Sequence, residues 1–246
     1  MKAEYLKIPV ELAQNSFVEG FYKQAGTYLA SQFYYSGKAR LSDKPAQKIA
    51  NRIGVSTRSV YRHFNWLLGR NWMGKDNING WLFFRGLDRI REIEGWKRKR
   101  AAVMLPEDLQ NFKEFLIGAV LSSIIKTGKG AGTDRPCKGS EPSGFPISLS
   151  LIQNVMGVSR RTAITYIKIA KKGGYIKKRP NLRQVTGISS KDIQLLKQNN
   201  VNRVKVNLFG SSESIQVKPQ QLRTDKGYVY AQLANLITAN VQLRKR

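Results

Sequence analysis

The chain has 246 residues, and its 43 Lys and Arg residues outweigh 16 Asp and Glu residues, giving a formal net charge of +27 at pH 7. No apolar run approaches the ~18 residues of a membrane span, and no sustained apolar stretch follows the N-terminal lysines, so neither a span nor a signal peptide is expected. Cys137 is the only cysteine and His63 the only histidine, which excludes zinc fingers and intramolecular disulfides. We expect a cytoplasmic, nucleoid-associated protein without a metal or other cofactor.

The basic excess is spread along the chain. Residues 1–100 hold 19 basic and 8 acidic residues (net +11), and residues 101–246 hold 24 basic and 8 acidic residues (net +16). A single basic tail is therefore excluded, and a chain this basic is expected to bind a polyanion. DNA, an RNA scaffold and an anionic membrane surface are the polyanionic partners that this charge allows. The length fits two domains of ~100 residues each.

Three helices are predicted in the first part of the chain. Residues 21–35 place apolar and aromatic side chains at helical spacing and are followed by a Ser-Gly stop. Residues 44–53 form a second helix with a proline in its first turn, where the missing N–H is harmless. Gly54 ends that helix, and Ser56 is suited to cap a third one.

The third helix is predicted to be amphipathic. Val60, Phe64 and Leu67 fall at i, i+4 and i+7 and form one buried stripe. The opposite side is polar, long-armed and positive, which suits contacts with base edges and phosphates in a major groove. The candidate DNA-binding residues on this helix are Ser56, Thr57, Arg58, Ser59, Tyr61, Arg62 and Asn65.

A β-hairpin is predicted after the third helix. Residues 72–73 and 81–84 read as strands, and the Gly, Asn and Asp residues between them read as the loop. A hairpin in this position is the wing of a winged-helix domain. The wing residues expected near the DNA backbone or minor groove are Lys75, Asn77, Asn79 and Arg85.

A basic segment follows the first unit. Residues 85–100 are predicted to form a helix that leaves the wing, and residues 96–104 to link the two domains. Between two DNA-reading units, consecutive cations suit a backbone contact or a minor-groove strap. These cations are Lys97, Arg98, Lys99 and Arg100.

The Gly-Val-Ser turn between the second and third helices is typical of a helix-turn-helix, and the same pattern is repeated 103 residues later. Met156-Gly157-Val158-Ser159 matches Ile53-Gly54-Val55-Ser56, and the register holds without a gap over roughly thirty residues. A first helix over 107–126 and a Gly- and Pro-rich loop over 127–147, predicted to be mobile, precede this second copy. The outward face of its third helix would carry Ser159, Arg160, Arg161, Thr162, Thr165 and Lys168.

Two interpretations of Arg160 and Arg161 stay open: a bidentate contact with guanine, or contacts with phosphate alone. A strand at 175–176 is predicted to enter a second wing, with Arg183 at its tip and residues 184–186 as the returning strand. The candidate DNA-binding residues of this wing are Lys177, Lys178, Arg179 and Arg183.

The remaining residues belong to neither copy. Residues 204–208 and 215–217 predict a hairpin, and a final helix is expected to present Tyr230, Leu233, Ala234 and Ile237 on its apolar face. The predicted fold class is therefore mainly α with small β-wings (α+β), with two tandem winged-helix domains. The expected divisions are 1–95, the linker 96–104, 105–200, and 201–246.

Catalytic signatures are missing from the sequence. A rolling-circle nicking enzyme needs paired metal-binding histidines, whereas His63 stands alone and suggests packing or a phosphate contact. Two-metal nucleases need clustered carboxylates, and the nearest cluster, Asp88, Glu92 and Glu94, has two arginines among it. We therefore expect that the protein is not an enzyme.

Residues 21–185 resemble plasmid and phage replication initiator proteins built from two winged-helix domains. The resemblance rests on Gly54-Val55-Ser56 and Gly157-Val158-Ser159, with Arg58 and Arg161. It implies binding to repeated origin sites on double-stranded DNA, opening of adjacent AT-rich DNA, and recruitment of replication machinery. Two alternatives remain: a transcription regulator that contacts RNA polymerase, and a nucleoid-coating or partition protein. The oligomeric state is open.

Overall fold

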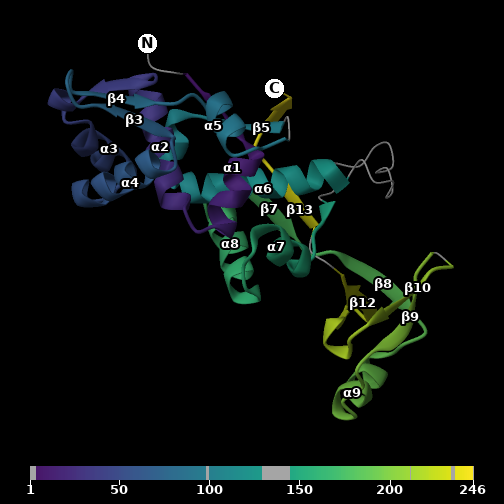
Figure 1. Cartoon of the computed structure of the whole chain (residues 1–246). Helices are drawn as coiled ribbons and strands as arrows, with labels where there is room; N and C mark the ends of the chain where they lie inside the picture. Colours follow the sequence, from purple (N-terminus) through teal and green to yellow (C-terminus); the bar gives the residue numbers. More distant parts are fainter. Residues whose placement is uncertain (1–3, 98–99, 129–144, 211, 234–235, 246) are drawn as a thin grey trace. The chain divides into compact units, whose positions relative to one another are not determined.

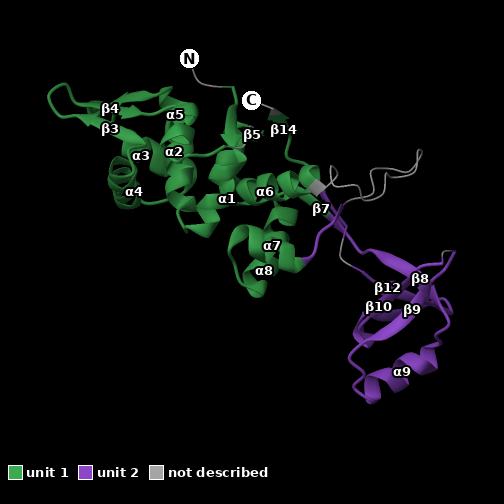
Figure 2. Ribbon diagram, turned by 45° about the vertical axis from the view of Figure 1, so that its right-hand side comes forward, with its two compact units in different colours: residues 1–135, 149–177, 239–246 green, residues 136–148, 178–238 purple. Residues whose placement is uncertain are grey.

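The structure is a computed structural model that describes residues 4–97, 100–128, 145–210, 212–233 and 236–245. It is a mixed α+β structure, and within these ranges it contains nine α-helices and four small sheets (Figure 1). The chain divides into two compact units (Figure 2). Unit 1 takes the described residues of 1–135, 149–177 and 239–246, and unit 2 those of 136–148 and 178–238. This division differs from the predicted domain boundaries.

Helices dominate unit 1. In chain order they are α1 (Val10–Val18), α2 (Tyr22–Tyr35), α3 (Pro45–Ile53), α4 (Thr57–Gly69), α5 (Leu87–Ile93), α6 (Phe112–Gly128), α7 (Leu149–Met156) and α8 (Arg160–Lys172). The two predicted sets of three helices are confirmed as α2–α3–α4 and α6–α7–α8. Helix α6 begins later than expected because Pro106–Asn111 form a 3-10 turn.

Helix α6 lies at the centre of unit 1. Between Phe115 and Leu121, every residue except Gly118 is a core side chain no more than 1% exposed. A helix that is apolar all round has to be covered on several sides. Helices α1 and α8 both pack on it (Figure 1), and α2 of the first set also contacts it, so the two three-helix sets share one core.

The first three-stranded sheet follows the order β2-β4-β3 and confirms the predicted hairpin after the third helix. Its strands are β2 (Lys38–Arg40), β3 (Met73–Asp76) and β4 (Trp81–Phe84). At its base, Trp72 is fully buried, and its ring contacts the rings of Phe21, Tyr28, Trp66 and Trp96. The aromatic side chains therefore fix the hairpin to the helices.

A second sheet includes residues for which the sequence predicts a helix (85–100) and a linker (96–104). The strand β5 (Arg100–Met104) is central, between β1 (Leu6–Pro9) and β14 (Leu243–Lys245). Helix α5 ends at Ile93, and Gly95 follows with φ +66. Residues 100–104 are therefore neither helix nor linker, because pairing with segments distant in sequence holds them as a strand.

The third sheet has the order β6-β13-β7, which parallels the order β2-β4-β3 of the first hairpin sheet. Its strands are β6 (Phe145–Pro146), β7 (Ile176–Arg179) and β13 (Leu236–Ala239). The predicted returning strand 184–186 was wrong, because β8 (Leu182–Thr186) pairs with β9 and β12. The strand that pairs with β7 is β13, and a separate sheet is inserted in the chain between these two strands.

That inserted sheet makes up most of unit 2. Its order is β10-β9-β8-β12-β11, and its strand pairs are antiparallel. Besides β8, the elements are α9 (Ser190–Gln198), β9 (Val204–Leu208), β10 (Ser214–Val217), β11 (Leu222–Asp225) and β12 (Tyr228–Gln232). The predicted hairpin at 204–217 is confirmed as β9 and β10. Ile193 of α9 joins valines of the sheet in the core of unit 2.

The predicted C-terminal helix was wrong, because Tyr230 lies in β12, Ile237 lies in β13, and Leu233 follows the end of β12. Val229 and Ala231 are buried while Tyr228 is exposed, so the apolar period is two. Lys226 and Gly227 have φ of +48 and +81, the two positive values of a tight hairpin turn. Ala234 lies outside the described residues.

Candidate nucleic-acid interface

The turn between α3 and α4 sets the direction of α4. Gly54 has φ +66, a left-handed value that glycine adopts without steric cost. The Val55 N–H donates to the carbonyl of Ala50 at 3.1 Å. The Ser56 hydroxyl then accepts from the Ser59 N–H at 3.1 Å, which confirms the predicted cap.

The turn between α7 and α8 has the same construction. Gly157 has φ +62, and the Val158 N–H donates to the carbonyl of Gln153 at 3.1 Å. The Ser159 hydroxyl accepts from the Thr162 N–H at 3.2 Å. The repeat seen in the sequence therefore extends to individual hydrogen bonds.

The buried stripes of α4 and α8 also match the predictions. Val60, Phe64 and Leu67 are at most 4% exposed on α4, and the corresponding residues of α8 are at most 6% exposed. Those residues are Ala163, Ile167 and Ala170. Burial of these stripes turns the opposite side of each helix toward solvent.

The predicted outward faces are exposed. On α4 the exposed members are Arg58, Tyr61, Arg62 and Asn65. On α8 they are Arg160, Arg161, Thr165 and Lys168. The five cations in these two sets form no salt bridge within the described part of the chain, so their charge faces solvent. Thr57, Ser59 and Thr162 are half-buried, and the Thr165 hydroxyl donates to the Arg161 carbonyl at 3.0 Å.

In the β3–β4 loop, Lys75 and Asn77 are exposed, as expected for wing contacts. Asn79 is engaged: its side-chain amide donates to the Asp76 carboxylate at 2.8 Å. This bond, with backbone N–H bonds from Asn79 and Ile78, lowers the pKa of Asp76. The loop is therefore held by its own carboxylate, with Ile78 exposed at its tip.

Arg85 lies at the base of the first hairpin. Its guanidinium donates to the carbonyl oxygen and the side-chain oxygen of Asn71, both at 2.7 Å. Its own carbonyl accepts from the Tyr28 hydroxyl at 2.6 Å and from the Gln32 amide at 2.8 Å. The Arg85 carbonyl therefore fastens the hairpin to α2, and the Arg85 guanidinium is held by Asn71.

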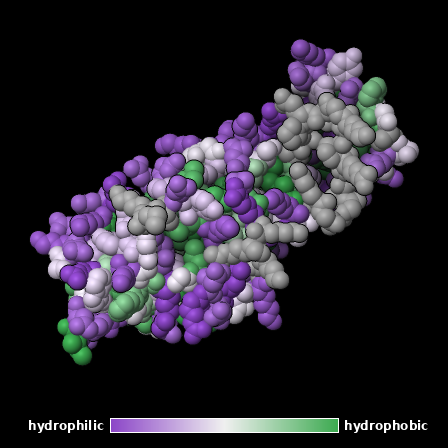
Figure 3. Space-filling view, turned by 90° about the horizontal axis from the view of Figure 1, so that it is seen from above, coloured by the Kyte–Doolittle hydropathy of each residue, from purple (hydrophilic) through white to green (hydrophobic). Residues whose placement is uncertain are grey.

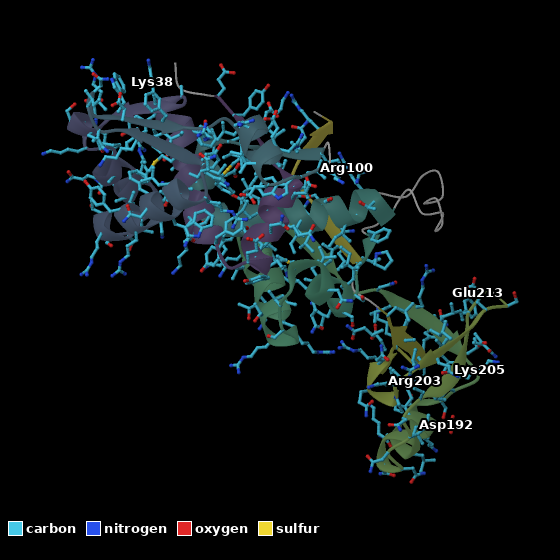
Figure 4. The ribbon with its side chains drawn as sticks, viewed as in Figure 1. Lys38, Arg100, Asp192, Arg203, Lys205 and Glu213 are labelled. Carbon is cyan, nitrogen blue, oxygen red and sulfur yellow. The ribbon has the colours of Figure 1, made fainter. Side chains whose placement is uncertain are left out.

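Of the four consecutive cations, Lys97 and Arg100 are described, and neither lies in a helix. The backbone N–H of Lys97 donates to the Glu11 carboxylate at 2.9 Å, and the Lys97 side chain is exposed. Arg98 and Lys99 lie outside the described residues. Arg100, labelled in Figure 4, is half-buried on β5, and its guanidinium donates to the Thr127 hydroxyl at 3.0 Å.

The candidate cations of the second hairpin are divided between two sheets. Lys177, Lys178 and Arg179 are exposed on β7. Arg183 lies on β8, which belongs to the five-stranded sheet and not to the tip of the hairpin. Most of the predicted loop 127–147 lies outside the described residues.

His63 takes the packing role. Its Nδ1 lies 2.6 Å from the Thr27 hydroxyl, which joins α4 to α2. Burial, and then the nearby Lys23 charge, lower the pKa of His63. A cavity of about 580 Å³ opens beside it, lined by aromatic residues and by Arg62 and Lys113, a feature that the sequence did not indicate.

Contacts within unit 1 join the two three-helix sets. The Tyr22 ring of α2 stacks on the Phe112 ring of α6, with the ring centroids 6.3 Å apart. The Lys113 ammonium lies 5.0 Å from the Tyr22 ring and 5.1 Å from the Tyr166 ring. The outward faces of α4 and α8 are therefore carried by one compact unit.

Comparisons with protein-family models, with curated proteins and with solved structures found no match. Among the described helices none is long and apolar enough to cross a membrane. The described residues also contain no group of three or more His, Cys, Asp or Glu that could hold a metal ion. The face drawn in Figure 3 is largely hydrophilic.

Proposed function

We propose that this protein binds double-stranded DNA sequence-specifically through two winged-helix modules. The first would comprise α2, α3 and α4 with the sheet β2-β4-β3. The second would comprise α6, α7 and α8 with the sheet β6-β13-β7. In each, the capped third helix would lie in the major groove.

One observation carries this proposal: the same turn is followed by an exposed cationic helix face at two places in one chain. Gly54 and Gly157 share the left-handed backbone, and Ser56 and Ser159 share the cap. Capping and burial orient each helix, and arginines occupy the solvent side. Arginine pairs bidentately with guanine in the major groove, so such a face can read sequence as well as hold phosphate.

The most specific role we propose is replication initiation on a plasmid or phage, at repeated origin sites in the nucleoid. Support comes from the tandem arrangement of the modules and from the net charge of +27. A transcription regulator would use the same modules on a promoter. A coating or partition protein would use the charge without reading sequence.

A nuclease footprint on the DNA that flanks the gene tests all three roles at about 0.15 M salt. Several protected direct repeats beside an AT-rich tract are expected for the initiator. A single promoter-overlapping site would instead identify a regulator. Diffuse protection with a steep salt dependence would mean that the modules hold DNA without reading it.

A further inference from the structure

In unit 2, α9 packs against one face of the five-stranded sheet and forms the core with it. No described element covers the other face of this sheet. Along β12, Val229 and Ala231 point into the core with Ile193 of α9. Because successive side chains of a strand alternate between faces, Tyr228 and Tyr230 lie on the opposite face. We call that opposite face the outer sheet face.

Strand register brings three aromatic residues together on the outer sheet face. Tyr230 pairs with Gln184 of β8, and the Phe209 N–H donates to the Gln184 carbonyl at 3.0 Å from the other side. Phe209 and Tyr230 therefore flank Gln184 across neighbouring strands. Tyr228 stands two residues from Tyr230 on the same face. Phe209 is 65% exposed and Tyr228 is 58% exposed, although burying such rings would favour folding.

The same face carries cations and amides beside the rings. Arg223 pairs with Tyr230 across β11 and β12, and Lys205 lies on β9 (Figure 4). Asn207 pairs with Thr186 beside Tyr228. Residues 178–238 contain 10 Lys and Arg residues and 3 Asp and Glu residues, a net charge of +7. The outer sheet face therefore combines aromatic rings and amides with the cations Arg223 and Lys205 and with the carboxylate of Asp225, which pairs with Tyr228.

We propose that the outer sheet face binds single-stranded nucleic acid, with Phe209, Tyr228 and Tyr230 stacking on unpaired bases. Rings that project from a sheet can stack only on bases that are not already stacked in a duplex. Arg223 and Lys205 would contact the phosphates, and the amides of Gln184 and Asn207 would contact base edges. An apolar protein partner fits less well, because Arg223, Lys205 and the amides of Gln184 and Asn207 share the face with the rings. This site goes beyond the duplex binding proposed for α4 and α8 and does not depend on it.

The test is fluorescence anisotropy of the full chain with three labelled probes: an oligothymidine and an oligouridine of about 16 nucleotides, and a duplex. The variants are Phe209→Ala and Tyr228→Ala. Each is expected to weaken single-strand binding about tenfold or more, the effect of losing one stacked base, and to leave duplex affinity unchanged. Tyr228→Phe keeps the ring and should bind like the wild-type chain.

Leu195→Ala is the matched control, because Leu195 is 55% exposed on α9 rather than on the outer sheet face. Tighter binding of the thymidine or the uridine strand assigns the site to DNA or RNA, and either result supports stacking. The proposal is overturned if Phe209→Ala and Tyr228→Ala bind single strands as tightly as the wild-type chain, or if Leu195→Ala weakens binding equally. Failure of the winged-helix proposal would appear separately, as an unchanged duplex footprint in Arg58 and Arg62 variants.

Discussion

Arg70 and Glu94 form a bidentate ion pair, with Nε–Oε1 and Nη2–Oε2 distances of 2.7 Å. Arg70 follows the last residue of α4, and Glu94 follows α5. The remaining Nη1 of Arg70 donates to Glu19 at 2.7 Å, after the end of α1. The Trp72 indole N–H also donates to Glu94 at 2.7 Å. One guanidinium therefore joins the ends of three helices at the base of the first hairpin.

This pair should contribute measurably to stability. Glu94 is only 11% exposed, so replacing its carboxylate leaves the Arg70 charge poorly compensated. We expect Glu94→Ala to lower the free energy of unfolding by about 2 kcal/mol, the scale of hydrogen bonds to charged groups. Urea denaturation measures it. The control is Arg89→Ala, since the Arg89–Glu92 pair is exposed on both sides and should change stability by less than about 0.5 kcal/mol. Equal losses of stability in the two variants would contradict this role.

The same pair predicts a pH dependence. Burial alone would raise the pKa of Glu94, but hydrogen bonds from Arg70 and Trp72 outweigh burial and lower it below the ordinary 4.5. A lowered folded-state pKa means that the stabilisation is present above the unfolded value and is lost as pH falls through the folded one. The stability difference between the wild-type chain and Glu94→Gln should be constant at neutral pH and shrink in acid below pH 4.5. Urea denaturation at a series of pH values checks this, and a difference that grows in acid would reverse the assignment.

The two helix caps should be energetically alike. Ser56→Ala and Ser159→Ala each remove one side-chain acceptor from a first-turn N–H. We expect each to lower the free energy of unfolding by about 1 kcal/mol. Ser42→Ala, at an exposed position outside any cap, is the control and should be neutral. Thermal unfolding followed by circular dichroism compares the three, and a cap variant as stable as Ser42→Ala would show that its hydroxyl does not stabilise the helix.

The proposed reading helices can be separated by mutation. Arg58→Ala with Arg62→Ala removes two exposed cations from α4 and leaves α8 intact. We expect the first half of the footprint to disappear and the second half to remain, and each base that is no longer read should cost ~1–3 kcal/mol of binding free energy. Arg89→Ala, an exposed arginine on α5, should leave the footprint unchanged. A complete footprint in the double variant would rule out base reading by α4.

Local features of this protein were predictable from the sequence alone. The helices around Gly54 and Gly157, their serine caps and their buried stripes depend on residues within a few positions of one another. Capping and helical periodicity are short-range effects, so the chain itself carries their signal. The exposure of the candidate cations on α4 and α8 followed from the same periodicity.

Long-range pairing was decided only by the tertiary structure. The partner of β7 is β13, reached after an inserted sheet, and β14 completes a sheet with β5 from the middle of the chain. No residue near β7 or β5 specifies these partners, because strand pairing depends on contacts between distant segments. For the same reason Arg70 gave no sequence signal, since its partners Glu19 and Glu94 are distant in the chain. Residues 228–239 are too few for their apolar pattern to distinguish the helical period from the strand period. Burial against α9 and the neighbouring strands selected the strand for 228–232.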